Sequence, residues 1–123
     1  IMAAAVGDFS VRRRRRKMPR SAGRVRLTLV PTADILAGLA RRRRGQVLVG
    51  FAVEDAPGLA KAKRELLGKK CDYLVVNPPS AMGGRASRAC ILGRAGLVLP
   101  WGRRSKAALA RRVVALLEGK RRA

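Results

Sequence analysis

The chain has 123 residues, of which 29 are lysine or arginine and 7 are aspartate or glutamate, so its net charge is +22. Its length suits one domain. Hydrophobic residues make up 48% of the chain, a content that is too high for a disordered tail. With no histidine and only two cysteines, it excludes a Ser-His-Asp or Cys-His nucleophile system, a His-containing zinc site and a Cys₄ zinc site. No apolar run approaches the roughly 20 residues of a membrane span, so we expect no membrane partner.

The chain opens with an apolar segment that is followed by a basic one. Residues 1–6 form an apolar run that ends at a turn, which predicts a short buried strand. Residues 10–24 are rich in arginine and contain Pro19 and Gly23, which indicates a loop or flap. The polar–apolar alternation over residues 25–30 predicts a half-exposed strand after this flap.

Helices and strands then alternate through the middle of the chain. Thr32 is a suitable N-cap for a helix that ends before Gly45. Residues 46–52 are predicted as a strand, residues 59–67 as a second helix and residues 71–76 as a buried strand.

The last third of the chain begins with a Gly/Ser/Ala loop over residues 80–87. Apolar segments at 89–92 and 97–99 flank a glycine-bounded turn at 93–96, which predicts a β-hairpin. Ser105 is the predicted cap of a final helix. The apolar face of that helix contains Leu109, Val113, Leu116 and Leu117.

This order of elements predicts the α/β class. We expect a three-layer, Rossmann-like, mostly parallel sheet with helices on both faces and a C-terminal β-hairpin. Such sheets bind ligands beyond the carboxyl ends of their strands, and polar residues follow three predicted strands here: Asp8, Glu54 with Asp55, and Asn77. We therefore expect a ligand site where these strand ends meet; ordinary turn chemistry at each end is the alternative.

The two cysteines, Cys71 and Cys90, lie in apolar or mixed segments. We interpret them as small buried thiols in a reducing compartment, although a disulfide between them is the open alternative. The chain opens without the features of a secretory signal, so a cytoplasmic location is expected.

The basic residues occur partly in runs, of which residues 12–17 and 41–44 are the longest. Such runs favour binding of phosphate or other anions. Aromatic residues are few and scattered, and no RNA-recognition, zinc-finger or helix-turn-helix signature is present. We therefore do not expect nucleic acid as the main partner, and a basic nucleic-acid-binding protein is kept as the alternative.

Six segments in sequence order resemble motifs of one family. Residues 4–9 resemble its Ala-Ala-Val-Ala-Asp-Tyr strand end, and residues 17–20 its Lys-Ile-Lys-Lys flap. Residues 32–36 resemble its Pro-Asp-Ile-Leu helix start, residues 49–54 its Val-Gly-Phe-Ala-Ala-Glu strand, and residues 69–77 its Lys-x-x-Asp-x-Ile-Val-Ala-Asn segment. At the other end of the chain, Leu99-Pro100 with Ser105-Lys106 and Ala110 resembles its closing segment. Together they resemble phosphopantothenate–cysteine ligase, the phosphopantothenoylcysteine synthetase domain of coenzyme A biosynthesis. The resemblance covers nearly the whole chain and implies that residues 1–123 are the C-terminal portion of such a domain.

The resemblance implies a ligase reaction with CTP as co-substrate and Mg²⁺ as cofactor. The carboxylate of 4′-phosphopantothenate is activated as an acyl-cytidylate, and the amine of cysteine then displaces CMP. The resemblance also implies a homodimer and a flavin-dependent decarboxylase that is either fused or separate. A Rossmann-like nucleotide-binding domain without ligase activity is a further alternative.

The family's functional residues transfer to individual positions of this chain. Lys17 matches the catalytic flap lysine, and Asp8 matches the acid near the nucleotide and its Mg²⁺. The family has two nucleotide-binding lysines at this point, and strict spacing places Glu65 at the position of the first one. Lys63 or Arg64 would then have to take the role of that lysine. The remaining implied nucleotide-binding residues are Met2, Ala3, Ala4, Ala33, Asp34, Ile35, Leu36, Phe51 and Lys69.

The sequence also departs from the family pattern. Pro19 replaces the third basic position of the flap, and Ala33 stands where the family has proline. The family's Gly-rich nucleotide loop and its Asn-x-Ser-Ser-Gly stretch have no match in these 123 residues. We therefore expect an incomplete domain that is not a competent ligase by itself.

Overall fold

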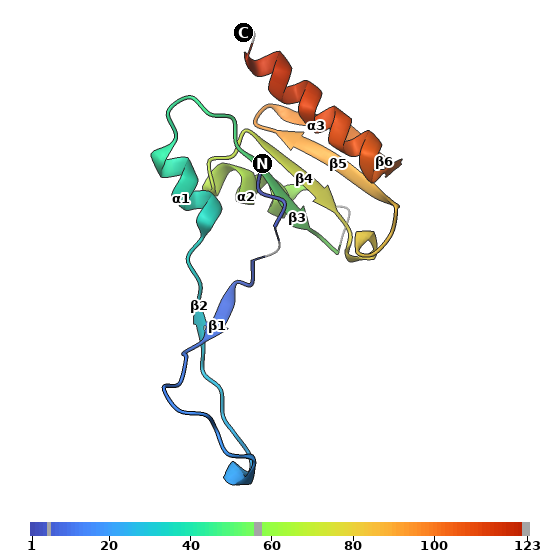
Figure 1. The fold of residues 1–123 in the computed structure, drawn as a ribbon. Helices are drawn as coiled ribbons and strands as arrows, with labels where there is room; N and C mark the ends of the chain where they lie inside the picture. The colour runs from blue at the N-terminus through green and yellow to red at the C-terminus, as the bar shows by residue number, and fades with distance from the viewer. Residues whose placement is uncertain (5, 56–57, 122–123) are drawn as a thin grey trace.

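The computed structural model describes residues 1–4, 6–55 and 58–121. It consists of a body built on a four-stranded sheet and an arm that projects from it (Figure 1). The elements in chain order are β1 (Phe9–Val11), η1 (Arg20–Ala22), β2 (Leu29–Pro31), α1 (Ile35–Arg42), β3 (Val49–Val53), α2 (Ala60–Gly68), β4 (Tyr73–Asn77), η2 (Pro79–Ala81), β5 (Ala86–Gly93), β6 (Gly96–Ser105) and α3 (Lys106–Arg121).

The sheet of the body has the strand order β3-β4-β5-β6. Strands β3 and β4 are parallel, whereas β4 with β5 and β5 with β6 pair antiparallel. The predicted α/β, Rossmann-like class and the C-terminal hairpin are confirmed. The sheet of this chain is mixed rather than mostly parallel, because the hairpin supplies two of its four strands.

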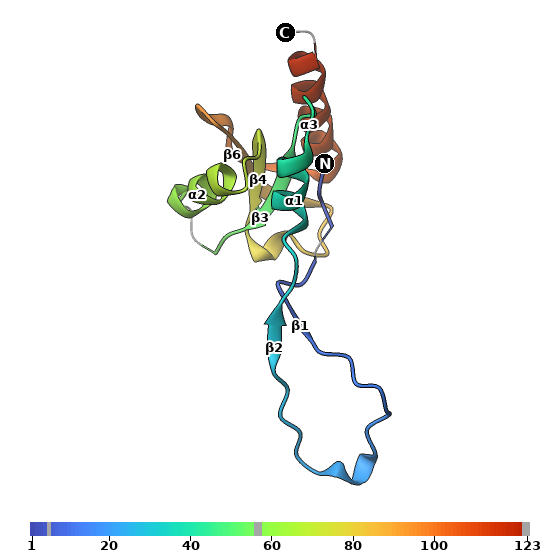
Figure 2. The same cartoon turned by 90° about the vertical axis from the view of Figure 1, so that its left-hand side faces the viewer.

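Helices cover both faces of this sheet, as predicted. On one face, Leu74 and Val76 of β4 pack in a cluster with Leu66 of α2. On the other face, Val75 packs in a cluster with Val113 of α3. Figure 2 shows α2 and α3 on opposite sides of the sheet. Because β4 is buried on both faces, its sequence is a continuous apolar run without alternation.

Helix α1 approaches strand β3 closely at a glycine. A Cβ atom on Gly50 would lie 2.8 Å from Leu36 Cδ2 and 3.0 Å from Leu74 Cδ1. These distances are too short for a real side chain, so glycine at this position allows Leu36 of α1 to enter the core.

The N-terminal caps of α1 and α3 differ in how well the sequence predicted them. The predicted cap of α3 is confirmed, since the Ala108 N–H donates to Ser105 Oγ at 3.1 Å. The predicted cap of α1 was wrong: Asp34, not Thr32, accepts the hydrogen bond of the Ala37 N–H, at 2.9 Å. Both residues suit an N-cap, and the start of the helix selects between them.

The apolar run at the N-terminus is not the strand that we predicted. Residues 1–4 and 6 have no regular secondary structure, and residue 5 lies outside the described parts of the chain. The Met2 N–H donates to Val49 O at 2.9 Å, but one such bond beside β3 does not make a strand ladder. The strand predicted over residues 25–30 is likewise reduced to β2, where the chain meets β1.

Both cysteine side chains are fully buried and free, which confirms the interpretation as buried thiols. Burial raises the pKa of both Cys71 and Cys90, to about 11 for Cys90. Both thiols are therefore protonated at neutral pH and poorly reactive. Within the described part of the chain, no helix has the length and apolar character needed to cross a bilayer.

Candidate functional site

A cavity of about 500 Å³, here called the strand-end cavity, lies at the carboxyl end of β3. Four separate segments form it: the N-terminal segment, the turn before α1, the end of β3, and α2 with the residue after it. Its lining residues are Met2, Ala4, Val6, Asp8, Thr32, Ala33, Asp34, Ile35, Leu36, Phe51, Ala52, Val53, Glu54, Lys61, Glu65 and Lys69.

Thr32 ties the two ends of the arm together beside this cavity. Its hydroxyl donates to Gly7 O, and its N–H donates to Asp8 O at 2.9 Å. These two bonds bring the chain entering the arm next to the chain leaving it. Asp8 and the start of α1 are therefore held on the same side of the strand-end cavity.

The N-terminus of α1 faces the strand-end cavity, which is lined by Ile35 and Leu36 of the first helical turn. Backbone N–H groups in the first turn of a helix have no partner within the helix. The positive end of the helix dipole also favours an anion there. Asp34 accepts a hydrogen bond from one of these groups, the Ala37 N–H.

Two lysines reach the strand-end cavity, and each contacts a carboxylate. Lys69 Nζ lies 2.8 Å from Glu65 Oε1 and 3.9 Å from Asp34 Oδ2. Lys61 Nζ lies 3.0 Å from Glu54 Oε2. The hydrogen bond to Glu65 raises the pKa of Lys69, so Lys69 stays protonated at neutral pH. An incoming phosphate would compete with Glu65 for the Lys69 ammonium.

The strand-end cavity is acidic on balance, because Asp8, Asp34, Glu54 and Glu65 outnumber the two lysines that line it. In the described ranges, no three His, Cys, Asp or Glu side chains converge in a way that would hold a metal ion. A single carboxylate such as Asp8 does fit Mg²⁺ that arrives with a triphosphate, because this ion prefers few protein ligands together with phosphate oxygens and water. A polyanion in this cavity would need such a cation.

Most of the residues predicted from the sequence to bind nucleotide line this one cavity. They are Met2, Ala4, Asp8, Ala33, Asp34, Ile35, Leu36, Phe51 and Lys69. Ala3 lines a neighbouring cavity instead. Lys17 lies on the arm, between β1 and η1, and is not among the lining residues.

The lysine of α2 that lines the cavity is not the one that the sequence suggested. The lining includes Lys61 and Glu65 but neither Lys63 nor Arg64. Residues 61, 65 and 69 recur every four positions, which places them along one helical face. This spacing is the feature of the sequence from which Lys61 could have been predicted to line the cavity. The sequence identified its partner Glu54 only as a polar residue that follows a strand.

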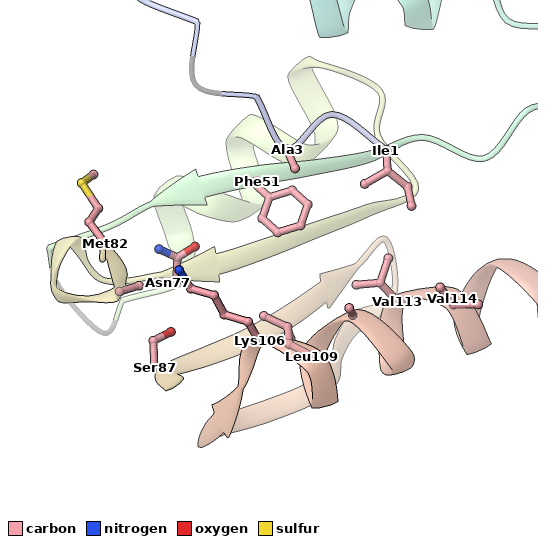
Figure 3. Close-up of a pocket in the computed structure, with 12 residues that line it drawn as sticks. Ile1, Ala3, Phe51, Asn77, Met82, Ser87, Lys106, Leu109, Val113 and Val114 are labelled. Atoms are coloured by element: carbon pink, nitrogen blue, oxygen red, sulfur yellow. The ribbon is translucent and has the colours of Figure 1, made fainter. Parts of the chain in front are cut away.

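A second cavity, of about 510 Å³, lies between β3 and α3 and is here called the apolar cavity. Figure 3 shows Phe51 from β3 and Leu109 and Val113 from α3 pointing toward it. Phe51 lines both cavities. Asn77 lines the apolar one, so the three polar strand ends do not share a single cavity. A hydrogen bond from the Glu54 N–H to Asn77 O, at 3.0 Å, joins the two sites.

The chain is similar to two curated proteins, but it spans only 28% of one and 21% of the other. It is 34% identical over 100 residues to a cysteine/cysteine sulfinic acid decarboxylase from an unknown prokaryotic organism, covering 76% of this chain and 28% of that protein. It is 37% identical over 84 residues to the coenzyme A biosynthesis bifunctional protein CoaBC of Bacillus subtilis (strain 168), covering 68% of this chain and 21% of that protein.

Two solved structures share the fold. The crystal structure of the C-terminal domain of a coenzyme A biosynthesis bifunctional protein CoaBC aligns with a TM-score of 0.64 and 23% identity, covering 94% of this chain and 50% of that chain. The DNA/pantothenate metabolism flavoprotein from Streptococcus pneumoniae aligns with a TM-score of 0.68 and 16% identity, covering 84% of this chain and 45% of that chain. This chain thus corresponds to half or less of either solved chain.

The match to a family is broader than any of these pairwise similarities. The model of the DNA/pantothenate metabolism flavoprotein C-terminal domain matches residues 1–119, which is nearly the whole sequence. The matched region includes every residue that lines the strand-end cavity. The chain therefore belongs to the family of DNA/pantothenate metabolism flavoprotein C-terminal domains.

Proposed function

We propose that this chain is the nucleotide-binding part of a CTP-dependent phosphopantothenate–cysteine ligase of coenzyme A biosynthesis. The observation that supports this most is the convergence of the N-terminal segment (Met2, Ala4, Val6 and Asp8), residues 32–36 and the end of β3 on one cavity that Lys69 also lines. These segments resemble the ligase motifs individually, and the fold brings them together. Family membership and the similarity to a coenzyme A biosynthesis protein support the pathway.

In this proposal the strand-end cavity holds CTP. Phe51, which is 38% exposed, offers an aromatic surface on which the cytosine packs. The triphosphate lies toward the N-terminus of α1 and Lys69, where free N–H groups and an ammonium meet it. Asp8 would hold Mg²⁺ together with the phosphates, and the ion would neutralise charge on the leaving pyrophosphate.

The proposed reaction has two steps. A carboxylate oxygen of 4′-phosphopantothenate attacks the α-phosphorus of CTP, and the bond to the β-phosphate breaks, which releases pyrophosphate. The amine of cysteine then attacks the acyl carbon, CMP leaves, and the nitrogen loses a proton. Both substrates are anionic, so cations in the site must screen their repulsion. Lys17 would assist when the arm closes over the cavity and excludes water from the mixed anhydride.

The complete enzyme in this proposal contains more than these 123 residues. We propose a cytoplasmic homodimer, with the flavin-dependent decarboxylase either fused to it or supplied as a separate protein. The solved relatives are about twice as long as this chain, which supports the view that it is an incomplete domain.

The nucleotide site is tested by replacing Lys69 with methionine and measuring Mg²⁺–CTP binding by calorimetry. Removing one charge-assisted contact is expected to weaken binding roughly tenfold or more. Lys63→Met is the matched control, because Lys63 is exposed on α2 and does not line the cavity. Its affinity is expected to stay within about twofold of the wild type. Equal losses in both variants, or no CTP binding by the wild type, would contradict this site.

Turnover by the isolated chain is expected to be absent. With CTP, 4′-phosphopantothenate and cysteine, the 123-residue chain should release no pyrophosphate above background, whereas a complete ligase assayed in parallel should. Robust turnover would refute the view that the domain is incomplete. CTP binding without amide formation by a version extended to a complete domain would identify a nucleotide-binding protein that is not a ligase.

A further inference from the structure

The projecting arm contains a dense group of positive charges. Between Asp8 and Asp34 the sequence contains nine lysines and arginines and no acidic residue. These nine are Arg12, Arg13, Arg14, Arg15, Arg16, Lys17, Arg20, Arg24 and Arg26. Nearly a third of the basic residues of the protein thus lie within 15 consecutive positions.

In the part of the chain that the structure describes, these cations pair with no carboxylate. The arm begins as a two-stranded antiparallel ribbon, with Val11 of β1 opposite Leu29 of β2, and its tip carries η1 (Figures 1 and 2). All nine side chains are exposed. Among the described residues, the ion pairs all involve lysines or arginines outside the arm. The nine charges therefore repel one another, and an external polyanion would relieve that repulsion.

A nucleotide in the strand-end cavity does not account for so many cations. A nucleoside triphosphate carries far fewer negative charges than the nine positive charges of the arm. The arm extends outward from the body, with η1 at its far end (Figure 2). A ligand that neutralises the whole arm must itself be extended and repeat its negative charge along its length.

The composition of the arm favours duplex nucleic acid over other polyanions. Eight of the nine cations are arginine, whose planar guanidinium matches phosphate oxygens in a bidentate manner. The backbone of a duplex repeats such phosphate oxygens along its whole length. Residues 12–24 contain no aromatic side chain, so the basic segment has no platform for stacking unpaired bases.

We propose that the arm binds the phosphate backbone of double-stranded nucleic acid without sequence specificity. The scarcity of aromatic residues argued against nucleic acid in the sequence, but it argues only against base stacking. Backbone binding depends on cations that are free to meet phosphates, and the exposure of these side chains in the segment beyond the β1–β2 ribbon supplies that condition.

The test compares two variants of the chain that lose the same charge from different places. In the arm variant, Arg12, Arg13, Arg14, Arg15 and Arg16 are each replaced by glutamine, and Lys17 is retained. In the control variant, five exposed arginines of the body are replaced by glutamine, namely Arg41, Arg42, Arg44, Arg111 and Arg112. Binding to a short, labelled, random-sequence DNA duplex is followed by fluorescence anisotropy over a series of salt concentrations.

The arm variant is expected to bind the duplex roughly tenfold or more weakly at about 0.1 M salt, with a slope of log K against log [salt] that is shallower by about 3 to 4. The control variant should lose about threefold or less. Equal losses in the two variants would overturn the proposal, because bulk charge would then explain binding. Failure of the wild type to bind the duplex, or arm-dependent binding to phosphatidylserine-containing vesicles without duplex binding, would overturn it too.

Discussion

Replacing Leu66 with alanine is expected to lower the free energy of unfolding by about 3 kcal/mol. Leu66 lies on α2, is fully buried, and packs with Ala62 and Leu74 in the core between α2 and the sheet. The substitution removes apolar contacts and leaves a cavity that the packed sheet cannot fill by collapsing. Urea unfolding followed by circular dichroism measures the change.

The neighbouring residue provides the control for this experiment. Leu67 is 51% exposed on the same helix, so Leu67→Ala changes the same number of atoms with little loss of buried area. Its expected effect is about 0.5 kcal/mol or less. If the two variants lost equal stability, α2 would not dock on the sheet through the face that contains Leu66.

The second large effect is expected at Asp72, where an alanine should lower the free energy of unfolding by about 2–3 kcal/mol. Asp72 is 6% exposed and holds three parts of the chain together. Its carboxylate accepts hydrogen bonds from Arg43 and from the Leu48 N–H, both at 2.8 Å, and from Lys120 at 2.6 Å. Removing it leaves two cations and one buried N–H without this partner. The cost stays below that of a fully buried pair because both cations are partly exposed.

This effect of Asp72 is also expected to depend on pH. Burial alone would raise the pKa of Asp72, but hydrogen bonds from Lys120 and the Leu48 N–H and the charges of Lys120 and Arg43 outweigh burial and lower it. A carboxylate with a lowered folded-state pKa stabilises the protein above its unfolded pKa of about 3.9. The difference between the wild type and Asp72→Ala should thus be full at neutral pH and shrink as pH falls through the folded pKa.

Glu118→Ala on α3 is the control for Asp72, since it removes the same charge from an exposed position. The free energy of unfolding of the Glu118→Ala variant should stay within about 0.5 kcal/mol of the wild-type value at neutral pH. A stability difference at Asp72 that did not change between neutral and acidic pH would show that the charge of this carboxylate contributes nothing. Thermal unfolding over a pH series measures both variants.

The sequence predicted those features that depend on neighbouring residues. The apolar face of α3 is confirmed, because Leu109, Leu116 and Leu117 pack around Val113 at helical spacing. The cap at Ser105 and the hairpin between β5 and β6 are confirmed as well. Helical periodicity, a cap and a tight turn are each determined within a few residues, so a local pattern is enough to identify them.

For the candidate site, the sequence indicated which segments matter, and the fold decided how they meet. Asp8, Asp34 and Phe51 were singled out from motifs, and they line one cavity. The sequence did not show that Lys61 contacts Glu54, or that Lys69 reaches Asp34. Each of these contacts depends on how α2 sits beside β3 or beside the turn before α1, which no single motif encodes.

Tertiary structure alone decided the features that join distant parts of the chain. Asp72 meets residues that are 29 and 48 positions away, and the N-terminal apolar run lies beside β3 without becoming a strand. An apolar run forms a strand only where a neighbour offers a full ladder of hydrogen bonds, and a charge finds its partner only after packing brings the two together. Local propensity determined the helices, the turn and most of the core strands, whereas long-range packing determined the cavity, the ion pairs and the outward direction of the basic arm.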